Sequence, residues 1–389
     1  MRRLLLTLLI IGATAPVAAQ SSQFGIRGLG HPGRASSVRT LGTGGAFGLF
    51  DGESTQNPAA LASLGAVTSA FTASTSWRTA VNPGGEASAQ STRFPLVLVG
   101  GPVGRTRLSA SFSYSSYTDR DFTLASSGII SPRGVPVAYS DTLSSRGGIN
   151  DLRVAGSWKV SPRLSVGAGV HFLTGSNRLS TRRVFDDSSY IAAEQRAELA
   201  YNAIGVSAGF VVQPRAGLAI AGSVRRDGPL DITRDSTPTG TVDLPLTLLG
   251  GVRLRVRPRI EVAGQVASRN WSVGNEQLRA EGATGARNTF EASGGVELIS
   301  NTRRPGQRPL RLGVRYAKLP FLIAGSPQPE EWGVSAGTGM RFRPSADSRD
   351  VGGIDLTVER IQRKSGTAYT ESAWLLSVGL TIFTGGAAQ

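Results

Sequence analysis

The sequence is poor in the residues that carry most metal, redox and nucleophilic chemistry. It contains no cysteine and only two histidines, His31 and His171, among 389 residues. The absence of cysteine excludes disulfide bonds, thiolate nucleophiles, cysteine–zinc sites and acylation of the lipoprotein type, and two histidines leave little room for a histidine-based metal site. We therefore expect no cofactor and no metal.

Long apolar runs are also scarce, and the one at the N-terminus is short. The chain starts with a basic segment at 1–3, continues with apolar residues at 4–12 and has small residues before Gln20. This order is typical of a secretory signal peptide, which we predict over 1–20. No later stretch approaches 18 continuous apolar residues, so we expect no transmembrane helix. The mature chain is then either soluble outside the cytoplasm or crosses a membrane as a β-barrel.

Lysine is rare, whereas arginine is abundant. Lys159, Lys318 and Lys364 are the only lysines, yet basic residues outnumber acidic ones by 42 to 27 and the formal net charge is +15. Such an excess points toward anionic partners such as nucleic acid, anionic lipid or acidic solutes. The arginines are spread along the chain without an aromatic-rich basic module, so nucleic acid is not an expected partner.

From residue 66 onward, apolar side chains alternate with small or polar ones, which is typical of strands with two chemically different faces. Between Leu164 and Phe172, for example, every second residue is apolar. Alternating runs occur at 66–78, 93–101, 105–124, 149–160, 163–174, 197–212, 216–226, 243–256, 259–271, 288–300, 310–320, 331–343, 353–363 and 370–383. We predict an all-β fold, a transmembrane antiparallel β-barrel of about fourteen strands over 66–384. The alternative is a soluble β-sandwich, although its strands would average ~5–6 residues.

Connections between these runs alternate between short turns and longer polar loops, as in outer-membrane barrels. The predicted long outer loops are 79–92, 125–148, 175–196, 227–242 and 272–287. Their apolar residues, the candidates for a solute-capture groove, are Ile129, Ile130, Val135, Val137, Phe185, Tyr190 and Ile191. Four tryptophans fall at the outer rim of this topology, where their rings suit the membrane–water interface, and Trp158 falls near the inner rim. The four are Trp77, Trp271, Trp332 and Trp374.

Residues 21–65 do not alternate and carry a recognisable motif. In order, they contain Leu41-Gly42-Thr43-Gly44-Gly45-Ala46-Phe47, then Asp51, then Asn57-Pro58-Ala59-Ala60-Leu61. This order resembles the N-terminal region of the FadL-like family of outer-membrane long-chain fatty-acid transporters, which includes PorV-like relatives from type IX secretion. The resemblance implies that 21–65 fold inside the barrel as a hatch. Its predicted hatch residues are Leu41, Gly42, Gly44, Gly45, Asp51, Asn57, Pro58 and Ala59.

Two other interpretations concern the ends of the barrel. Residues 21–65 could instead be an ordinary periplasmic lead-in, because glycine, asparagine and proline are common turn residues. At the other end, 385–389 is a short C-terminal tail, and Phe383 takes the place of the terminal aromatic residue that outer-membrane assembly machinery recognises in such barrels.

The alternation also predicts which charged residues line the lumen. The candidate lumen arginines are Arg153, Arg253, Arg255, Arg311 and Arg315. Arginine on the lipid face at the membrane midplane costs ~2–4 kcal/mol, so a barrel keeps it inside. These side chains form either a wall that favours anions and carboxylate head groups or a structural ladder of ion pairs that fills the lumen.

Nothing in the sequence requires catalysis. The string Gly28-x-Gly30-x-x-Gly33 lacks the preceding strand of a dinucleotide site. His171 is expected to face the lumen, where a hydrogen-bonded wall residue is a simpler interpretation than a Ser–His hydrolase site. The acidic pairs Asp186-Asp187 and Glu330-Glu331 are predicted as solvated loop charge or as divalent-ion contacts with lipopolysaccharide. We therefore predict no catalytic residue and no enzymatic activity.

The predicted function is passive transport of hydrophobic or amphipathic small molecules across the outer membrane of a Gram-negative-type bacterium, reached by secretory export. The alternative is a PorV-like secretion-accessory barrel that binds exported proteins at its rim and transports no solute. Expected partners are outer-membrane lipid and lipopolysaccharide, the solute or exported protein, and the outer-membrane assembly machinery. A soluble extracellular β-protein is the third possibility.

Overall fold

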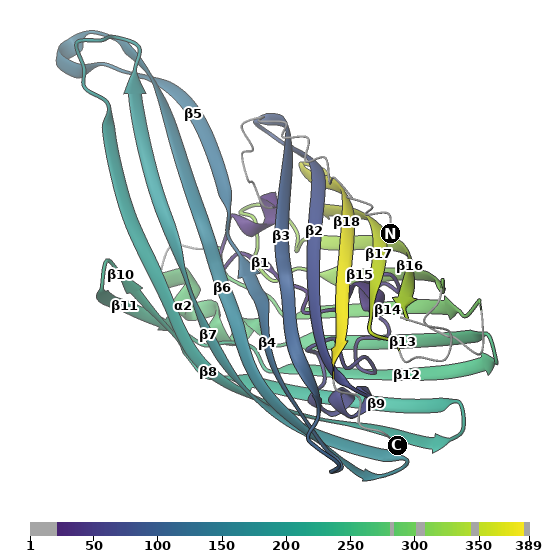
Figure 1. Cartoon of the computed structure of the whole chain (residues 1–389). Helices are drawn as coiled ribbons and strands as arrows, with labels where there is room; N and C mark the ends of the chain where they lie inside the picture. Colours follow the sequence, from purple (N-terminus) through teal and green to yellow (C-terminus); the bar gives the residue numbers. More distant parts are fainter. Residues whose placement is uncertain (1–21, 281–283, 301–307, 344–349, 385–389) are drawn as a thin grey trace, which may run out of the picture.

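Fourteen antiparallel strands form a closed barrel in the computed structural model, which describes residues 22–280, 284–300, 308–343 and 350–384 (Figure 1). Each strand is hydrogen-bonded to the next, and β18 pairs with β2 to close the wall. The barrel strands are β2 (Val67–Asn82), β3 (Gly85–Pro102), β4 (Leu108–Asp119), β6 (Val137–Ser161), β7 (Leu164–Phe185), β8 (Ala193–Arg215), β9 (Leu218–Asp227), β12 (Thr247–Arg257), β13 (Ile260–Arg269), β14 (Thr289–Leu298), β15 (Leu310–Lys318), β16 (Glu330–Phe342), β17 (Gly352–Ser365) and β18 (Tyr369–Thr384).

Each of the fourteen predicted runs corresponds to one barrel strand, so the predicted fold is confirmed. The predicted signal peptide and C-terminal tail lie outside the described residues. The smaller elements are η1 (Gln23–Gly25), β1 (His31–Pro32), α1 (Val38–Leu41), η2 (Pro58–Ser63), β5 (Phe122–Ile130), η3 (Pro132–Gly134), β10 (Leu230–Arg234), β11 (Thr237–Val242), η4 (Trp271–Gly274) and α2 (Asn275–Ala280). None of the helices in the described ranges is long and apolar enough to cross a membrane.

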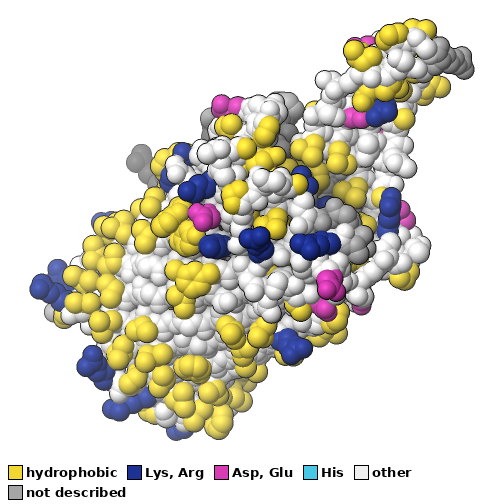
Figure 2. All heavy atoms as spheres, turned by 180° about the vertical axis from the view of Figure 1, so that it is seen from behind, with side chains coloured by type: hydrophobic (Ala, Val, Ile, Leu, Met, Phe, Trp, Pro, Cys, Tyr) yellow, Lys and Arg dark blue, Asp and Glu magenta, His cyan; other side chains and the backbone are white. Residues whose placement is uncertain are grey.

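Alternation along the strands separates the two faces of the wall. In β18, Trp374 and Leu380 are 51% and 43% exposed, whereas Ser377 and Thr381 are almost completely buried. Hydrophobic side chains gather over the outside of the barrel (Figure 2). The wall therefore presents an apolar surface outward and a small, polar one inward, as a chain placed between hydrocarbon and an enclosed interior requires.

The long connections differ from their prediction as loops. Residues 125–148 and 175–196 consist largely of strand, because β5 pairs with β6, and the ladders of β6, β7 and β8 continue to the pair Arg183–Ala193. These strands rise above the rest of the wall (Figure 1). Polar residues occur on both of their faces and break the apolar alternation, so alternation cannot reveal these strands, whereas backbone hydrogen bonding still holds them together. Of the other loops, 227–242 forms the β10–β11 hairpin and 272–287 contains η4 and α2.

Candidate functional site

The N-terminal segment, residues 22–65, runs through the inside of the barrel and is hydrogen-bonded to the wall (Figure 1). The amide of Gly44 donates to Ser335 Oγ on β16 at 2.9 Å, and Leu49 N donates to Gln265 Oε1 on β13 at 3.2 Å. Gly44 has φ of +66°, and an added Cβ there would lie 2.6 Å from the carbonyl oxygen of Val314. Glycine is therefore required where this segment turns against β15.

Asp51 and Asn57 organise the turns of the N-terminal segment. The Asp51 carboxylate accepts hydrogen bonds from Ser37 Oγ at 2.5 Å and from Thr40 Oγ1 at 2.9 Å. Asn57 Oδ1 accepts from Ala59 N at 3.0 Å and thereby caps η2. Its Nδ2 donates to the carbonyl oxygens of Leu49 and, on β8, Phe210. These contacts bind the segment to itself and to the wall.

The remaining predicted hatch residues lie at turns of the N-terminal segment or against the barrel wall. Leu41 ends α1, and Gly42 lies against Gly337 of β16, where an added Cβ would approach its Cα to 3.4 Å. Gly45 has φ of +100°. Pro58 and Ala59 open η2 and pack on β7, where a Cβ on Gly167 would meet their backbone. The sequence motif thus marks the places where the segment turns or touches the wall.

Lumen arginines of β15, β16 and β17 form a ladder of buried ion pairs. Arg311 Nε donates to Glu297 at 2.7 Å, and its Nη1 donates to Asp355 at 2.6 Å. One layer away, Arg315 Nε donates to Glu291 at 2.9 Å and also binds Glu331. The ladder continues through Arg363, which bridges Glu331 and Glu371. Glu331 was predicted as solvated loop charge, but this is wrong, because β16 begins at Glu330 and directs Glu331 inward.

Two arginines of the N-terminal segment join this ladder. Arg39 makes a two-point contact with Glu297, at 3.1 Å and 2.8 Å, and Arg34 makes another with Glu359, at 2.9 Å and 2.6 Å. The Glu297 carboxylate therefore binds one arginine of the N-terminal segment and one of the wall, since it also binds Arg311. Paired guanidinium–carboxylate contacts are strong and directional, so they fix the segment against β14 and β17.

The other candidate lumen arginines have different environments. Arg153 is buried, and its Nη1 donates to the carbonyl oxygen of Thr55 at 2.6 Å. The guanidinium of Arg253 lies 5.3 Å from the ring centre of Phe50. Arg255 pairs with Glu261 at a largely exposed position. The five predicted residues therefore do not converge on one anion site.

The Glu53 carboxylate in the N-terminal segment provides a pH-dependent contact. Its Oε2 accepts from Thr381 Oγ1 at 3.1 Å, and its Oε1 lies 4.0 Å from Arg341. Burial, reinforced by the negative charges of Asp51 and Asp355, raises the pKa of Glu53 from 4.5 to about 7 against the opposing effect of Arg341 and Arg39. At a pH between 4.5 and about 7, Glu53 therefore remains protonated in the folded protein but is ionised in the unfolded chain.

We expect the free energy of unfolding to fall as the pH rises from about 4.5 through 7, by up to roughly 3 kcal/mol from this group. The contribution is complete below the unfolded pKa and lost above the folded one. Glu53→Gln should flatten the profile and be more stable than the wild type at pH 8, measured by urea unfolding in micelles at pH 4 and 8. Glu86→Gln, at an exposed position near the start of β3, is the matched control. An unchanged slope in Glu53→Gln would contradict the assignment.

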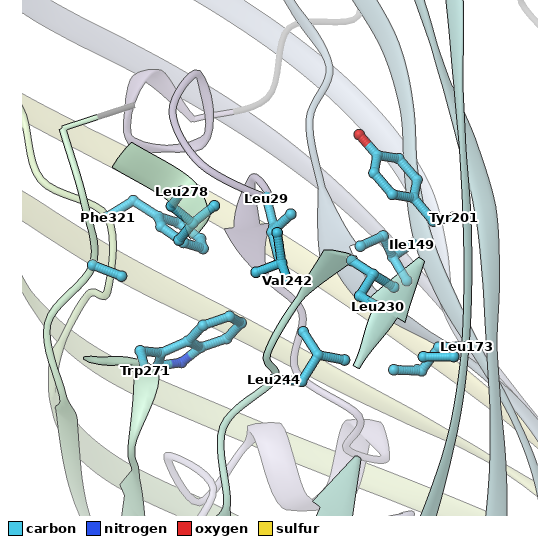
Figure 3. Packing of buried hydrophobic residues seen from close by; sticks show 12 residues of the cluster. Leu29, Ile149, Leu173, Tyr201, Leu230, Val242, Leu244, Trp271, Leu278 and Phe321 are labelled. Atoms are coloured by element: carbon cyan, nitrogen blue, oxygen red, sulfur yellow. The ribbon is translucent and has the colours of Figure 1, made fainter. Parts of the chain in front are cut away.

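Apolar side chains gather at the outer mouth of the barrel, beneath the outer connections. This mouth cluster contains Leu29, Ile149, Leu173, Tyr201, Leu230, Val242, Leu244, Trp271, Leu278 and Phe321 (Figure 3). Trp271 and Phe321 pack edge to face, with ring centres 5.2 Å apart. The sequence places Trp271 at the outer rim as an interface residue, which is wrong because its side chain is 3% exposed and points into the cluster. Trp77, Trp332 and Trp374 are exposed on the outside.

The capture-groove candidates from the long loops lie elsewhere. Ile129, Val135 and Ile191 are exposed on the tall strand extension, and the rings of Phe185 and Tyr190 pack with centres 5.4 Å apart. None of the seven candidates belongs to the mouth cluster among the residues that the structure describes. Sequence reasoning missed the cluster because its twelve members are spread along the chain from Leu29 to Phe321.

The barrel wall is interrupted between β3 and β4. These strands pair from Leu96–Ser115 to Pro102–Ser109, and no pair joins them above Leu96 within the described chain. At this level Phe94 and Pro95 bulge out of the β2–β3 ladder, whose register shifts there. Proline lacks a donor and is found in sheets at edges and bulges. The sequence therefore interrupts the wall at Pro95.

Other contacts frame this wall break. The unpaired end of β4 is covered from inside by β1, through the pairs His31–Asp119 and Pro32–Thr118. Arg93 of β3 reaches across to Asp119 at 2.7 Å and to Asp121 at 2.5 Å. The break is thus bounded by the backbone pairs of β1 with β4 and by ion pairs from Arg93 of β3.

Two adjoining cavities lie between the mouth and the wall break. The first cavity, about 120 Å³, lies beneath Trp271 and includes Leu249 and Tyr117 among its lining residues. The second cavity, about 320 Å³, is lined by Phe94, Pro95 and Tyr114 at the break. Both cavities are lined by Pro32, Gly33, Arg34, Leu41 and Ser116, so the N-terminal segment and β4 separate them.

Comparisons with known proteins agree with this architecture. A family model described as BamG, an outer-membrane barrel family, matches residues 1–221. The fold is similar to that of a Pseudomonas aeruginosa FadL homologue, with a TM-score of 0.63, 14% identity and coverage of 91% of this chain and 99% of that one. No curated protein matches the chain.

Two toluene transporters also share the fold. TbuX from Ralstonia pickettii has a TM-score of 0.58 and 14% identity, and TodX from P. putida has a TM-score of 0.58 and 13% identity. Each comparison covers 90% of this chain and 99% of the other. The predicted resemblance to FadL-like barrels is confirmed.

Proposed function

This chain belongs to the BamG family of outer-membrane barrels, and we propose that it is a passive channel for hydrophobic or amphipathic small molecules. The observation that carries the proposal is the pair of cavities leading from the apolar mouth cluster to the break between β3 and β4. In this proposal, the chain reaches the outer membrane by secretory export, is inserted by the assembly machinery, and contacts lipid and lipopolysaccharide with its apolar wall.

The proposed route begins at the mouth cluster, where Trp271 lies between the outer connections and the first cavity. A solute then passes Pro32–Arg34 into the second cavity and leaves between β3 and β4. Exit through the wall keeps an apolar molecule out of the charged lumen beneath, where desolvating the ion pairs would be costly. Such a route needs no energy source, because the solute moves into hydrocarbon.

We propose that residues 21–65 act as the hatch of this channel. The segment fills the lumen below the cavities and holds its place through Arg34, Arg39 and Asn57. Aqueous flow through the barrel is then blocked while the lateral route stays available. The solved relatives that share the fold are named for toluene and hydrocarbon transport, which supports a solute channel more than a secretion-accessory barrel.

Uptake of radiolabelled toluene by intact cells of a Gram-negative host tests the route. Producing the protein should raise the initial uptake rate, and Ser116→Trp should return it to the background, because Ser116 lines both cavities. Ala110→Trp introduces the same side chain on the exposed face of β4 and should transport normally. Normal uptake in folded Ser116→Trp, at matched amounts in the membrane, would exclude this route.

A further inference from the structure

Three polar residues of adjacent strands form a hydrogen-bonded chain on the lumen side of the wall. Asp151 of β6 contacts His171 Nδ1 with both carboxylate oxygens at 2.9 Å, and His171 Nε2 lies 2.8 Å from Ser207 Oγ on β8. All three side chains are buried, with residue exposures of 8% or less. They are 20 and 36 residues apart in sequence.

The direction of the hydrogen bonds follows from the chemistry of the partners. Arg225 Nη1 donates to Asp151 Oδ2 at 2.5 Å, and this guanidinium holds Asp151 as a carboxylate acceptor. Because Asp151 only accepts, His171 Nδ1 carries the hydrogen and Nε2 presents its lone pair. The Ser207 hydroxyl then donates to Nε2, which is the arrangement of a serine nucleophile, its general base and the group that orients the base.

Ser207 also lies at the first cavity, close to the positively charged hydrogen-bond donor Arg225. The first cavity is lined by Ser207, His171, Asp151 and Arg225. Arg225 stands directly opposite Ser207 in the β8–β9 ladder. Its Nε donates to Asp227 at 2.9 Å and its Nη1 to Asp151, while Nη2 is buried without a hydrogen-bond partner among the described residues. A donor in this position suits the negative oxygen that forms when a nucleophile adds to a carbonyl.

We propose that Ser207, His171 and Asp151 form an esterase site for small carboxylic esters that enter the first cavity. Ser207 Oγ forms a bond to the ester carbonyl carbon while its proton moves to His171 Nε2. The carbon–oxygen bond to the alcohol then breaks, and the alcohol leaves with that proton. Water, deprotonated by His171, hydrolyses the acyl-serine to the acid and restores Ser207, so the balance is ester plus water to acid plus alcohol. This activity goes beyond transport and does not depend on the route through the wall.

Covalent labelling of the purified full-length protein in detergent tests the site. Phenylmethylsulfonyl fluoride should sulfonylate Ser207 with loss of fluoride, detected by mass spectrometry of peptides, and p-nitrophenyl acetate should release p-nitrophenol. His171→Gln should slow both reactions by roughly 10²-fold or more, because general-base catalysis contributes that much. Asp151→Asn should also slow them by disturbing the histidine tautomer.

Ser223→Ala is the matched control, since Ser223 is a buried lumen serine of β9 that bonds to a backbone carbonyl instead of histidine. It should react as fast as the wild type, whereas Ser207→Ala should not be labelled. Heat-modifiable migration in gels verifies that each variant is a folded barrel. Absence of a Ser207 adduct in the folded wild type, or equal rates in wild type and His171→Gln, overturns the proposal.

Discussion

Replacing Arg311 by methionine is expected to destabilise the barrel by about 3 kcal/mol, because it removes the buried cation that Glu297 and Asp355 share and leaves each carboxylate with a single arginine, Arg39 and Arg341 respectively. The Arg311 side chain is 2% exposed and binds Glu297 and Asp355 on either side of β15. Methionine fills much of the same volume as arginine, so the loss of stability comes from the missing charge rather than from a cavity. Urea unfolding in lipid vesicles measures the change.

Arg178→Met provides the comparison for Arg311→Met. Arg178 also pairs with a carboxylate, Glu198, but its side chain is 79% exposed and the separation is 3.6 Å. An exposed pair contributes about 0–1 kcal/mol, so this variant should unfold close to the wild type. Adding Glu297→Gln and Asp355→Asn to Arg311→Met should recover part of the lost stability. Equal effects of the two methionine substitutions would show that the buried ladder contributes no more than surface pairs.

Deleting residues 22–65 is expected to convert a closed barrel into an open aqueous channel. The intact protein should show no sustained current in planar bilayers, because the N-terminal segment occupies the lumen and is bound to both sides of it through Asn57 and Arg39. Without the segment, a wall lined by small and charged residues would enclose water, as in larger porins. Single-channel recording distinguishes these states directly.

A milder change controls for misfolding of the truncated chain. Arg34→Ala combined with Arg39→Ala removes two ion-paired anchors but leaves Glu297 bound to Arg311. This variant should show brief openings rather than a permanent channel. Large conductance in the intact protein, or none in a truncated barrel that retains heat-modifiable migration, would contradict the hatch assignment.

Some features of the candidate site were accessible from the sequence. The Gly44-Gly45 pair and Asn57-Pro58 signal tight turns that only certain residues allow, and the structure has turns there. The alternation places His171 and Arg311 inside, where the structure has them. The alternation does not show which inward-facing side chains contact one another. Asp151, His171 and Ser207 meet because the registers of β6, β7 and β8 place them along one diagonal.

The sequence by itself determined the number of strands and the face that each presents, because a strand between hydrocarbon and a polar interior must alternate residue by residue. Tertiary structure alone decided which charges pair and that Trp271 points into the mouth cluster. These features depend on contacts between residues far apart in the chain, and closure of the barrel sets the register that brings them together. Local pattern is a property of one strand, whereas a pathway or a hydrogen-bonded chain requires several strands in fixed alignment.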